Sequence, residues 1–129
     1  MINRRKFLGV SAGAAALSLS GVSLSAQAAK VKTSARIVIL GAGAAGTAMA
    51  NRLSDNLDGA KIILIDGRKQ HFYQPGFTLI AAGLKPADYS VTKTSEWLPS
   101  GAELIQEAAA EIDPDGKSVT TSSGKKVPY

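Results

Sequence analysis

Three glycines, Gly41, Gly43 and Gly46, have the spacing at which a polypeptide backbone can approach a phosphate group. Gly41 would permit a tight turn, Gly43 has no Cβ atom to hold a diphosphate away, and Gly46 would let a helix pack closely on a sheet. The N-terminus of the helix that follows would offer free N–H groups and partial positive charge to the phosphates. The spacing therefore predicts a dinucleotide-binding loop.

An acidic residue stands where such a loop requires one. Asp66 follows Gly46 by 20 residues and ends the second of two apolar runs, residues 37–40 and 62–65. In dinucleotide-binding units this acid accepts hydrogen bonds from the ribose hydroxyl groups. Because glycines, acid and apolar runs occur together, we favour this interpretation over a glycine-rich turn that binds no ligand.

The elements that must position these groups alternate between strand and helix. Residues 36–40 and 61–66 are apolar runs of strand length, and residues 44–57 place apolar side chains on one helical face. Asp58 and Gly59 end that helix. The pattern predicts an α/β fold that begins with a βαβ unit.

Shorter elements are expected after this unit. In chain order they are a loop (67–74), a short helical segment (76–82), a polar stretch up to Trp97, a third strand (102–105), a mixed or extended piece (107–112) and two strands (117–121 and 125–129). Residues 113–116, Asp-Pro-Asp-Gly, are a turn signal. The order predicts an incomplete Rossmann-like domain followed by a meander of β-hairpins, whose last strand remains an unpaired edge.

The first 28 residues have the pattern of an export signal. Arg4 and Arg5 precede an uncharged run rich in alanine, glycine and serine, and residues 26–28 form an Ala-x-Ala cleavage site. The segment resembles a twin-arginine (Tat) signal peptide, which implies export of a folded protein to the periplasm, at the outer face of the cytoplasmic membrane. The alternative is a retained anchor, since the run is long enough to span a bilayer. Its serines, glycines and cleavage site favour removal.

Charge and composition narrow the possible functions. The net charge of +5 falls to +2 without the three basic residues of the signal, and no basic stripe remains to favour nucleic acid as a partner. The chain has no cysteine and therefore no thiol chemistry of its own. Asp113 and Asp115 are read as a turn and not as a metal loop. The single histidine, His71, is read as structural in preference to an acid or base beside a cofactor.

The segment from residue 29 to residue 129 resembles the N-terminal part of the sulfide:quinone oxidoreductases, within the pyridine nucleotide-disulfide oxidoreductase superfamily. The stretches that carry this resemblance are the glycine fingerprint (37–46), His-Phe-Tyr-Gln-Pro with the residues after it (71–83), residues 109–114 and residues 119–129. Many families share the fingerprint, whereas His-Phe-Tyr-Gln-Pro is much more specific. The resemblance implies that residues 29–129, which follow the expected signal peptide (1–28), are a partial FAD/NAD(P)-binding domain, the incomplete N-terminal part of an FAD-binding domain.

The resemblance also implies roles for single residues. The diphosphate of FAD would lie on the glycine loop (41–46), and Asp66 would hold the adenosine ribose. Arg68 would cover the adenine. Gln74 and Pro75 would lie near the flavin ring, and the backbone at Ala109 would contact the adenine. The residues expected to bind FAD are Gly41, Ala42, Gly43, Ala45, Gly46, Asp66, Gly67, Arg68, Gln74, Pro75 and Ala109. FAD is favoured over NAD(P) because an exported protein meets little free NAD(P)H and because Asp66 repels a 2′-phosphate.

The intact enzyme implied by this resemblance would oxidise sulfide through cysteines located after Tyr129 and pass electrons from FAD to a membrane quinone. It would associate peripherally with the membrane through a C-terminal part, and residues 29–129 would hold no catalytic residue. Two alternatives stay open. One is the flavoprotein subunit of a flavocytochrome c sulfide dehydrogenase, which has a cytochrome partner. The other is a secreted nucleotide-binding module without redox activity.

Overall fold

The computed structural model describes residues 29–129, so the proposed export signal and its cleavage site lie outside the described residues. In chain order the elements are β1 (Val31–Lys32), β2 (Arg36–Leu40), α2 (Ala44–Asn56), β3 (Leu57–Asp58), β4 (Lys61–Ile65), β5 (Gln70–Phe72), η1 (Gln74–Gly76), α3 (Phe77–Ala81), η2 (Ala87–Ser90), β6 (Val91–Lys93), η3 (Thr94–Trp97), β7 (Glu103–Ile105), β8 (Ala109–Asp113), β9 (Ser118–Thr121) and β10 (Lys126–Pro128). Within this part of the chain, no helix has the length and apolar character needed to cross a membrane.

A three-stranded parallel sheet is the centre of the fold, and its strands lie in the order β2-β4-β7. β2 and β4 pair in register from Arg36–Lys61 to Leu40–Ile65, and α2 connects them, which confirms the expected βαβ unit. β4 is the middle strand, and its isoleucines and leucine are buried on both faces. Such a continuous run of β-branched and apolar residues is typical of a covered parallel strand.

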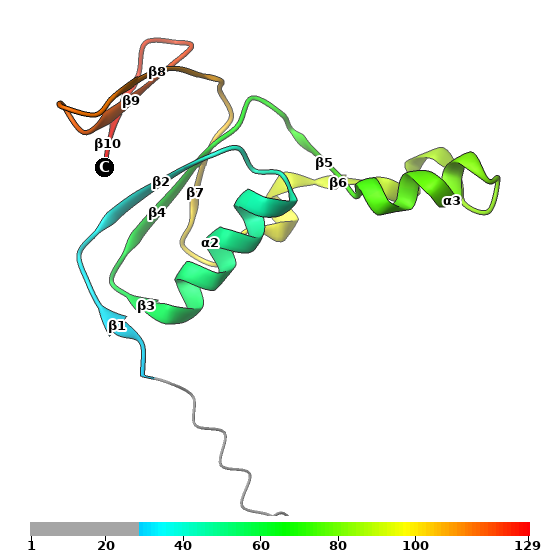
Figure 1. The fold of residues 1–129 in the computed structure, drawn as a ribbon, viewed down its shortest axis with the longest axis horizontal. Helices are drawn as coiled ribbons and strands as arrows, with labels where there is room; N and C mark the ends of the chain where they lie inside the picture. The colour runs from blue at the N-terminus through cyan, green and yellow to red at the C-terminus, as the bar shows by residue number, and fades with distance from the viewer. Residues whose placement is uncertain (1–28) are drawn as a thin grey trace, which may run out of the picture.

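Each face of the sheet has its own core. Ile62 and Leu64 of β4 pack with Ala42 and Ala50 on the side of α2, whereas Ile63 and Ile65 belong to a second cluster. That second cluster also contains Ile105, Val119 and Val127. The molecule therefore has three layers: α2, the parallel sheet, and the β8–β10 sheet on the opposite face, as Figure 1 shows.

The third layer is an antiparallel meander in the order β10-β9-β8. Asp113 Oδ1 accepts a hydrogen bond of 2.8 Å from the backbone N–H of Gly116, which closes the expected turn between β8 and β9. The expectation that the last run stays unpaired is wrong on one side, because Lys126 and Pro128 pair with Thr120 and Ser118 of β9. The other side of β10 is an edge of this sheet.

A second departure from the sequence prediction lies at the start of the described chain. Val31–Lys32, for which no element was expected, pairs in parallel with Leu57–Asp58, and the N–H of Thr33 donates to the carbonyl of Asp58 at 2.9 Å. Helix α2 consequently ends at Asn56, and Leu57 already has extended backbone angles. The helix therefore ends before the expected stop at Asp58 and Gly59, because Leu57 and Asp58 are already part of a strand pair.

Residues 67–97 form an arm, in which the expected short helical segment (76–82) is present as α3, whereas the expected loop and polar stretch each contain a strand. β5 and β6 pair antiparallel, with His71 opposite Thr92, and α3 with the short helical turns η1 and η2 lies beyond them. In Figure 1 the arm extends sideways from the end of the sheet where α2 begins. The arm therefore places residues from the His-Phe-Tyr-Gln-Pro segment beside the glycine loop.

Candidate nucleotide-binding site

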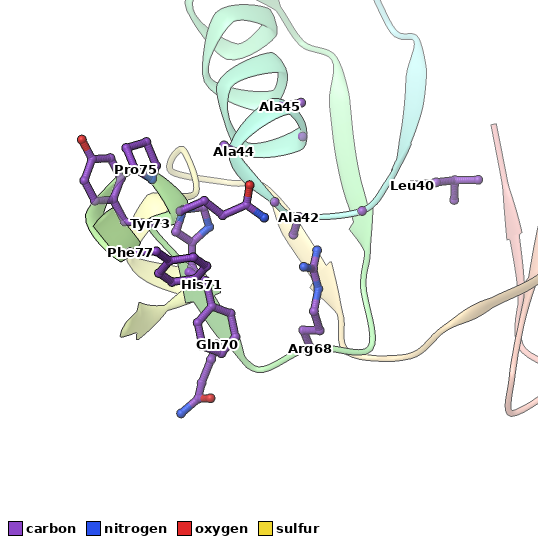
Figure 2. Close-up of a pocket in the computed structure, with 15 residues that line it drawn as sticks. Leu40, Ala42, Ala44, Ala45, Arg68, Gln70, His71, Tyr73, Pro75 and Phe77 are labelled. Atoms are coloured by element: carbon purple, nitrogen blue, oxygen red, sulfur yellow. The ribbon is translucent and has the colours of Figure 1, made fainter. Parts of the chain in front are cut away.

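A cavity of about 870 Å³ lies at the carboxyl end of β2, between the glycine loop and the arm. This volume is within the range of about 300–1,000 Å³ that is usual for sites of small molecules and cofactors. Figure 2 shows the loop with Ala42 and Ala44 on one side, and His71, Tyr73 and Phe77 on the other. Loops at the carboxyl ends of parallel strands are the usual place for a ligand in an open α/β sheet.

The glycines differ in what a side chain would meet. Gly41 has a φ of +95°, a backbone conformation that residues other than glycine rarely adopt. A Cβ on Gly46 would overlap the carbonyl group of Gly41, so this glycine is required by the fold itself. A Cβ on Gly43 would meet only Arg68 Nη2, at 3.5 Å, an ordinary contact distance. The fold therefore leaves Gly43 open toward the cavity, as a close approach by a diphosphate requires.

Asp66 sits behind this loop with its carboxylate already fully hydrogen-bonded. Oδ2 accepts from the backbone N–H of Ala42 at 2.7 Å and from Arg68 Nη2 at 2.8 Å. Oδ1 accepts from the backbone N–H of Arg68 at 2.8 Å and from its Nε at 3.1 Å. A carboxylate offers about four acceptor positions, so these four donors occupy all of them.

The ion pair fixes the charge of both partners. Hydrogen bonding from the Arg68 side chain, opposed by burial and helped by the two backbone N–H groups, holds the pKa of Asp66 well below its usual value of 3.8. Asp66 in turn raises the pKa of the Arg68 guanidinium. Asp66 is 8 % exposed, whereas the Arg68 side chain is 59 % exposed and borders the cavity. The arginine is therefore the solvent-exposed partner of the pair, and the acid is the buried one.

The arm forms the other wall of the cavity through β5, η1 and the start of α3. His71 is 92 % buried and packs its ring against Trp97, with 5.6 Å between the ring centroids. Trp97 is tied down on both sides: its Nε1 donates to Thr92 Oγ1, and its carbonyl accepts from Asn51 Nδ2 of α2, each at 2.7 Å. These contacts hold the arm against the helix that starts at the glycine loop.

The cavity brings together eight of the residues that the sequence predicts to bind FAD, namely Gly41, Ala42, Gly43, Ala45, Gly46, Arg68, Gln74 and Pro75. Asp66, Gly67 and Ala109 do not line it: Asp66 is shielded by Arg68, Gly67 lies against the backbone of Ala108, and Ala109 starts β8. The sequence prediction omitted Leu40, Ala44, Gln70, His71, Phe72, Tyr73 and Phe77, which also line the cavity. Most belong to the His-Phe-Tyr-Gln-Pro segment or adjoin it, so that signal was available but was applied only to Gln74 and Pro75.

Within the described residues, no group of three or more histidine, cysteine, aspartate or glutamate side chains is arranged to hold a metal ion. On the side of the glycine loop, the polar groups at the cavity are backbone N–H groups and the guanidinium of Arg68, and the arm adds neutral polar side chains such as Gln70, Tyr73 and Gln74. Such a donor set recognises phosphate oxygens. The site is therefore built for an anionic nucleotide.

Residues 35–129 match the family model of the pyridine nucleotide-disulphide oxidoreductases, and the chain belongs to this family. A relative is the mitochondrial sulfide:quinone oxidoreductase of Mus musculus, 38% identical over 93 residues that cover 72% of this chain and 21% of the relative. A second is the NADH-rubredoxin oxidoreductase of Clostridium acetobutylicum, 34% identical over 99 residues that cover 74% of this chain and 26% of the relative.

The structure is also similar to the X-ray structure of the sulfide:quinone oxidoreductase from Aquifex aeolicus. The TM-score is 0.59 at 32% sequence identity, and the match covers 74% of this chain and 22% of that chain. The expected fold class, the resemblance to sulfide:quinone oxidoreductases and FAD as the cofactor are thus confirmed. The matched region is about a fifth to a quarter of the length of each of these relatives.

Proposed function

We propose that this chain carries the nucleotide-binding part of an FAD-dependent oxidoreductase. The observation that supports this most directly is the cavity beside Gly43, where the backbone is open to a diphosphate and a guanidinium stands close by. The bound FAD would supply the electron chemistry, and the protein would hold and orient it. The glycine loop would hold the diphosphate, and the arm residues Gln74 and Pro75 would lie near the flavin ring.

We further propose that the intact protein is a sulfide:quinone oxidoreductase, which passes electrons from sulfide through FAD to a membrane quinone. The likeness to the mouse and Aquifex sulfide:quinone oxidoreductases supports this substrate pair. No cysteine occurs in this sequence, so the sulfur chemistry would need cysteines outside these 129 residues. Peripheral membrane association would also reside there.

The alternatives differ in the electron acceptor. A flavocytochrome c sulfide dehydrogenase subunit would reduce a cytochrome, and a nucleotide-binding module would reduce nothing. The test is to purify the full-length protein, record its flavin spectrum and add sulfide with either a soluble quinone or cytochrome c. Rapid quinone reduction supports the proposal. Reduction of cytochrome c alone favours the dehydrogenase subunit, and a protein without flavin absorbance contradicts the FAD site itself.

Export through the Tat pathway to the periplasm is a separate proposal, supported by the Arg4–Arg5 pair and the Ala-x-Ala site at 26–28. A folded cargo with its cofactor already bound is what this pathway carries. Replacing both arginines with lysine should leave the protein in the cytoplasm as an uncleaved precursor. Cell fractionation and immunoblotting measure where the double variant is located. Export at the level of the native protein would exclude the Tat assignment.

A further inference from the structure

The position of Arg68 raises a question about how any ribose reaches Asp66. Two of the four hydrogen bonds to the carboxylate come from backbone N–H groups, of Ala42 and of Arg68 itself, and these are fixed by the fold. The other two come from Nε and Nη2 of the Arg68 side chain, which form a fork on the two carboxylate oxygens. A ribose hydroxyl can therefore bond to Asp66 only where a guanidinium N–H now stands.

The fork and a ribose present the same pattern of donors. A guanidinium offers two parallel N–H groups to the two oxygens of a carboxylate. The 2′- and 3′-hydroxyl groups of a ribose are neighbouring cis donors and can address the same two oxygens. Because Asp66 is buried and the Arg68 side chain is largely exposed, the carboxylate stays in place while the guanidinium can be exchanged.

We infer that Arg68 is a displaceable stand-in for the adenosine ribose: its guanidinium occupies the acid in the empty site and leaves when the ribose diol arrives. This inference rests on the proposed nucleotide-binding function. While it is bound to Asp66, Nη2 of Arg68 already lies 3.5 Å from the position that a Cβ on Gly43 would occupy, so the guanidinium leaves the acid from a place next to the proposed diphosphate site. Its positive charge then has a second anionic partner without a large movement.

The exchange has a measurable consequence for specificity. In the native protein each hydrogen bond from the ribose replaces one from Arg68, so the two hydroxyl groups add little affinity. Without the fork, the same hydroxyl groups meet a buried carboxylate that lacks two donors. A hydrogen bond to such a charged group is then worth on the order of tenfold or more in affinity. Arg68 thus reduces the ability of the site to select a nucleotide by its ribose.

The test compares two probes, ADP and 2′,3′-dideoxy-ADP, by calorimetry on the full-length protein after its flavin has been removed. Native protein should prefer ADP by no more than about threefold, whereas Arg68→Met should prefer it on the order of tenfold. Arg68→Lys keeps the charge but cannot form the fork, so it should also show a raised preference for ADP. It serves as the test variant if Arg68→Met fails to fold. Lys69→Met removes the same charge from the neighbouring exposed residue and should behave like the native protein.

The outcomes separate this inference from the proposed function. An equal preference in the native protein and both Arg68 variants would overturn the stand-in role while leaving the nucleotide site intact. A preference that rises equally in Lys69→Met would also overturn it, because charge alone would then explain the effect. Failure of the native protein to bind either probe would overturn the proposed function and this inference together.

Discussion

At the scale of single residues, the glycines of the loop have separable tasks. Gly46 lies against the carbonyl group of Gly41, whereas Gly43 faces the cavity and has room for a side chain in the ligand-free fold. A substitution at Gly46 therefore acts on folding, and one at Gly43 acts on the ligand. The same chemical change at both positions distinguishes the two effects.

We predict that Gly43→Ala in the full-length protein folds normally and loses most of its flavin, while Gly46→Ala is destabilised. Overpacking of this kind costs about 1–3 kcal/mol or more. At Gly43 the change should cost at most about 1 kcal/mol, since it only replaces glycine with alanine at the N-cap of α2. Urea unfolding and the flavin absorbance per protein measure the two effects. A Gly43→Ala protein that remains fully loaded with flavin would contradict the role of the loop.

Asp66 should give the protein a specific dependence on acid. Its pKa in the folded state is lowered, chiefly by the Arg68 side chain, relative to 3.8 in the unfolded chain. A lowered pKa contributes stability that is present above the unfolded value and is lost as the pH falls toward the folded value. We predict that Asp66→Asn lowers the free energy of unfolding by about 1.5–3 kcal/mol at pH 7. The difference should shrink below about pH 4. Urea titrations at pH 7, 5, 4 and 3 test this, and a difference that does not change with pH would contradict it.

The sequence predicted the position of the glycine loop, which depends on backbone geometry. It did not predict the hydrogen bonds of Asp66, which depend on the conformation of a side chain. The spacing of Gly41, Gly43 and Gly46 placed the loop at the end of a strand, because the motif is a property of the backbone. It could not show that Asp66 is covered, since that depends on which of several conformations the exposed Arg68 side chain adopts. Ala109 was assigned through a resemblance, and in the structure it lies outside the cavity.

At the scale of elements, the strands and helix of the βαβ unit were predictable and the arm was not. The unit has long apolar periodic segments, for which pattern reading works well. β5 and β6 have three residues each and pair across an intervening helix, so their partners are not evident from local sequence. The polar composition of residues 85–96 concealed the strand within them. Trp97, which ends this polar stretch, is 49% exposed and holds the arm against α2.

The contacts of Trp97 predict its effect on the arm. Trp97→Phe keeps an aromatic ring near His71 and loses the hydrogen bond to Thr92, which should cost about 1 kcal/mol. Trp97→Ala also loses the ring contact and should cost about 2 kcal/mol, because the side chain is only half-buried. Tyr89→Phe, at another exposed ring of the arm, should change stability by less than about 0.5 kcal/mol. Thermal unfolding of the three variants measures the order of their stability losses. Equal losses of stability for Trp97→Phe and Trp97→Ala would contradict the predicted order.

At the scale of the whole molecule, the three layers leave apolar surface at one side. β2 is an edge strand of the parallel sheet. Beside it, a cavity of about 310 Å³ is lined by residues that include Leu40, Ile112 and Tyr129, each of which is more than 40% exposed. Arg36 Nε donates to the carbonyl of Pro128 at 3.2 Å and links β2 to the meander there. Parallel sheets are normally covered, and an open apolar edge favours association.

This surface predicts the behaviour of residues 29–129 expressed alone. We expect a free energy of unfolding below about 5 kcal/mol, the lower limit for typical domains, because the buried clusters are small beside the exposed apolar side chains. FAD should bind weakly, and sulfide should not support quinone reduction, since the segment has no cysteine. Urea unfolding, a flavin titration and a turnover assay measure these three properties. Ile112→Lys, at the open edge, should reduce binding of a hydrophobic dye without lowering stability by more than about 0.5 kcal/mol. A free energy of unfolding above this limit would show that the open apolar edge does not destabilise the segment. Turnover of sulfide would show that a group other than cysteine performs the sulfur chemistry.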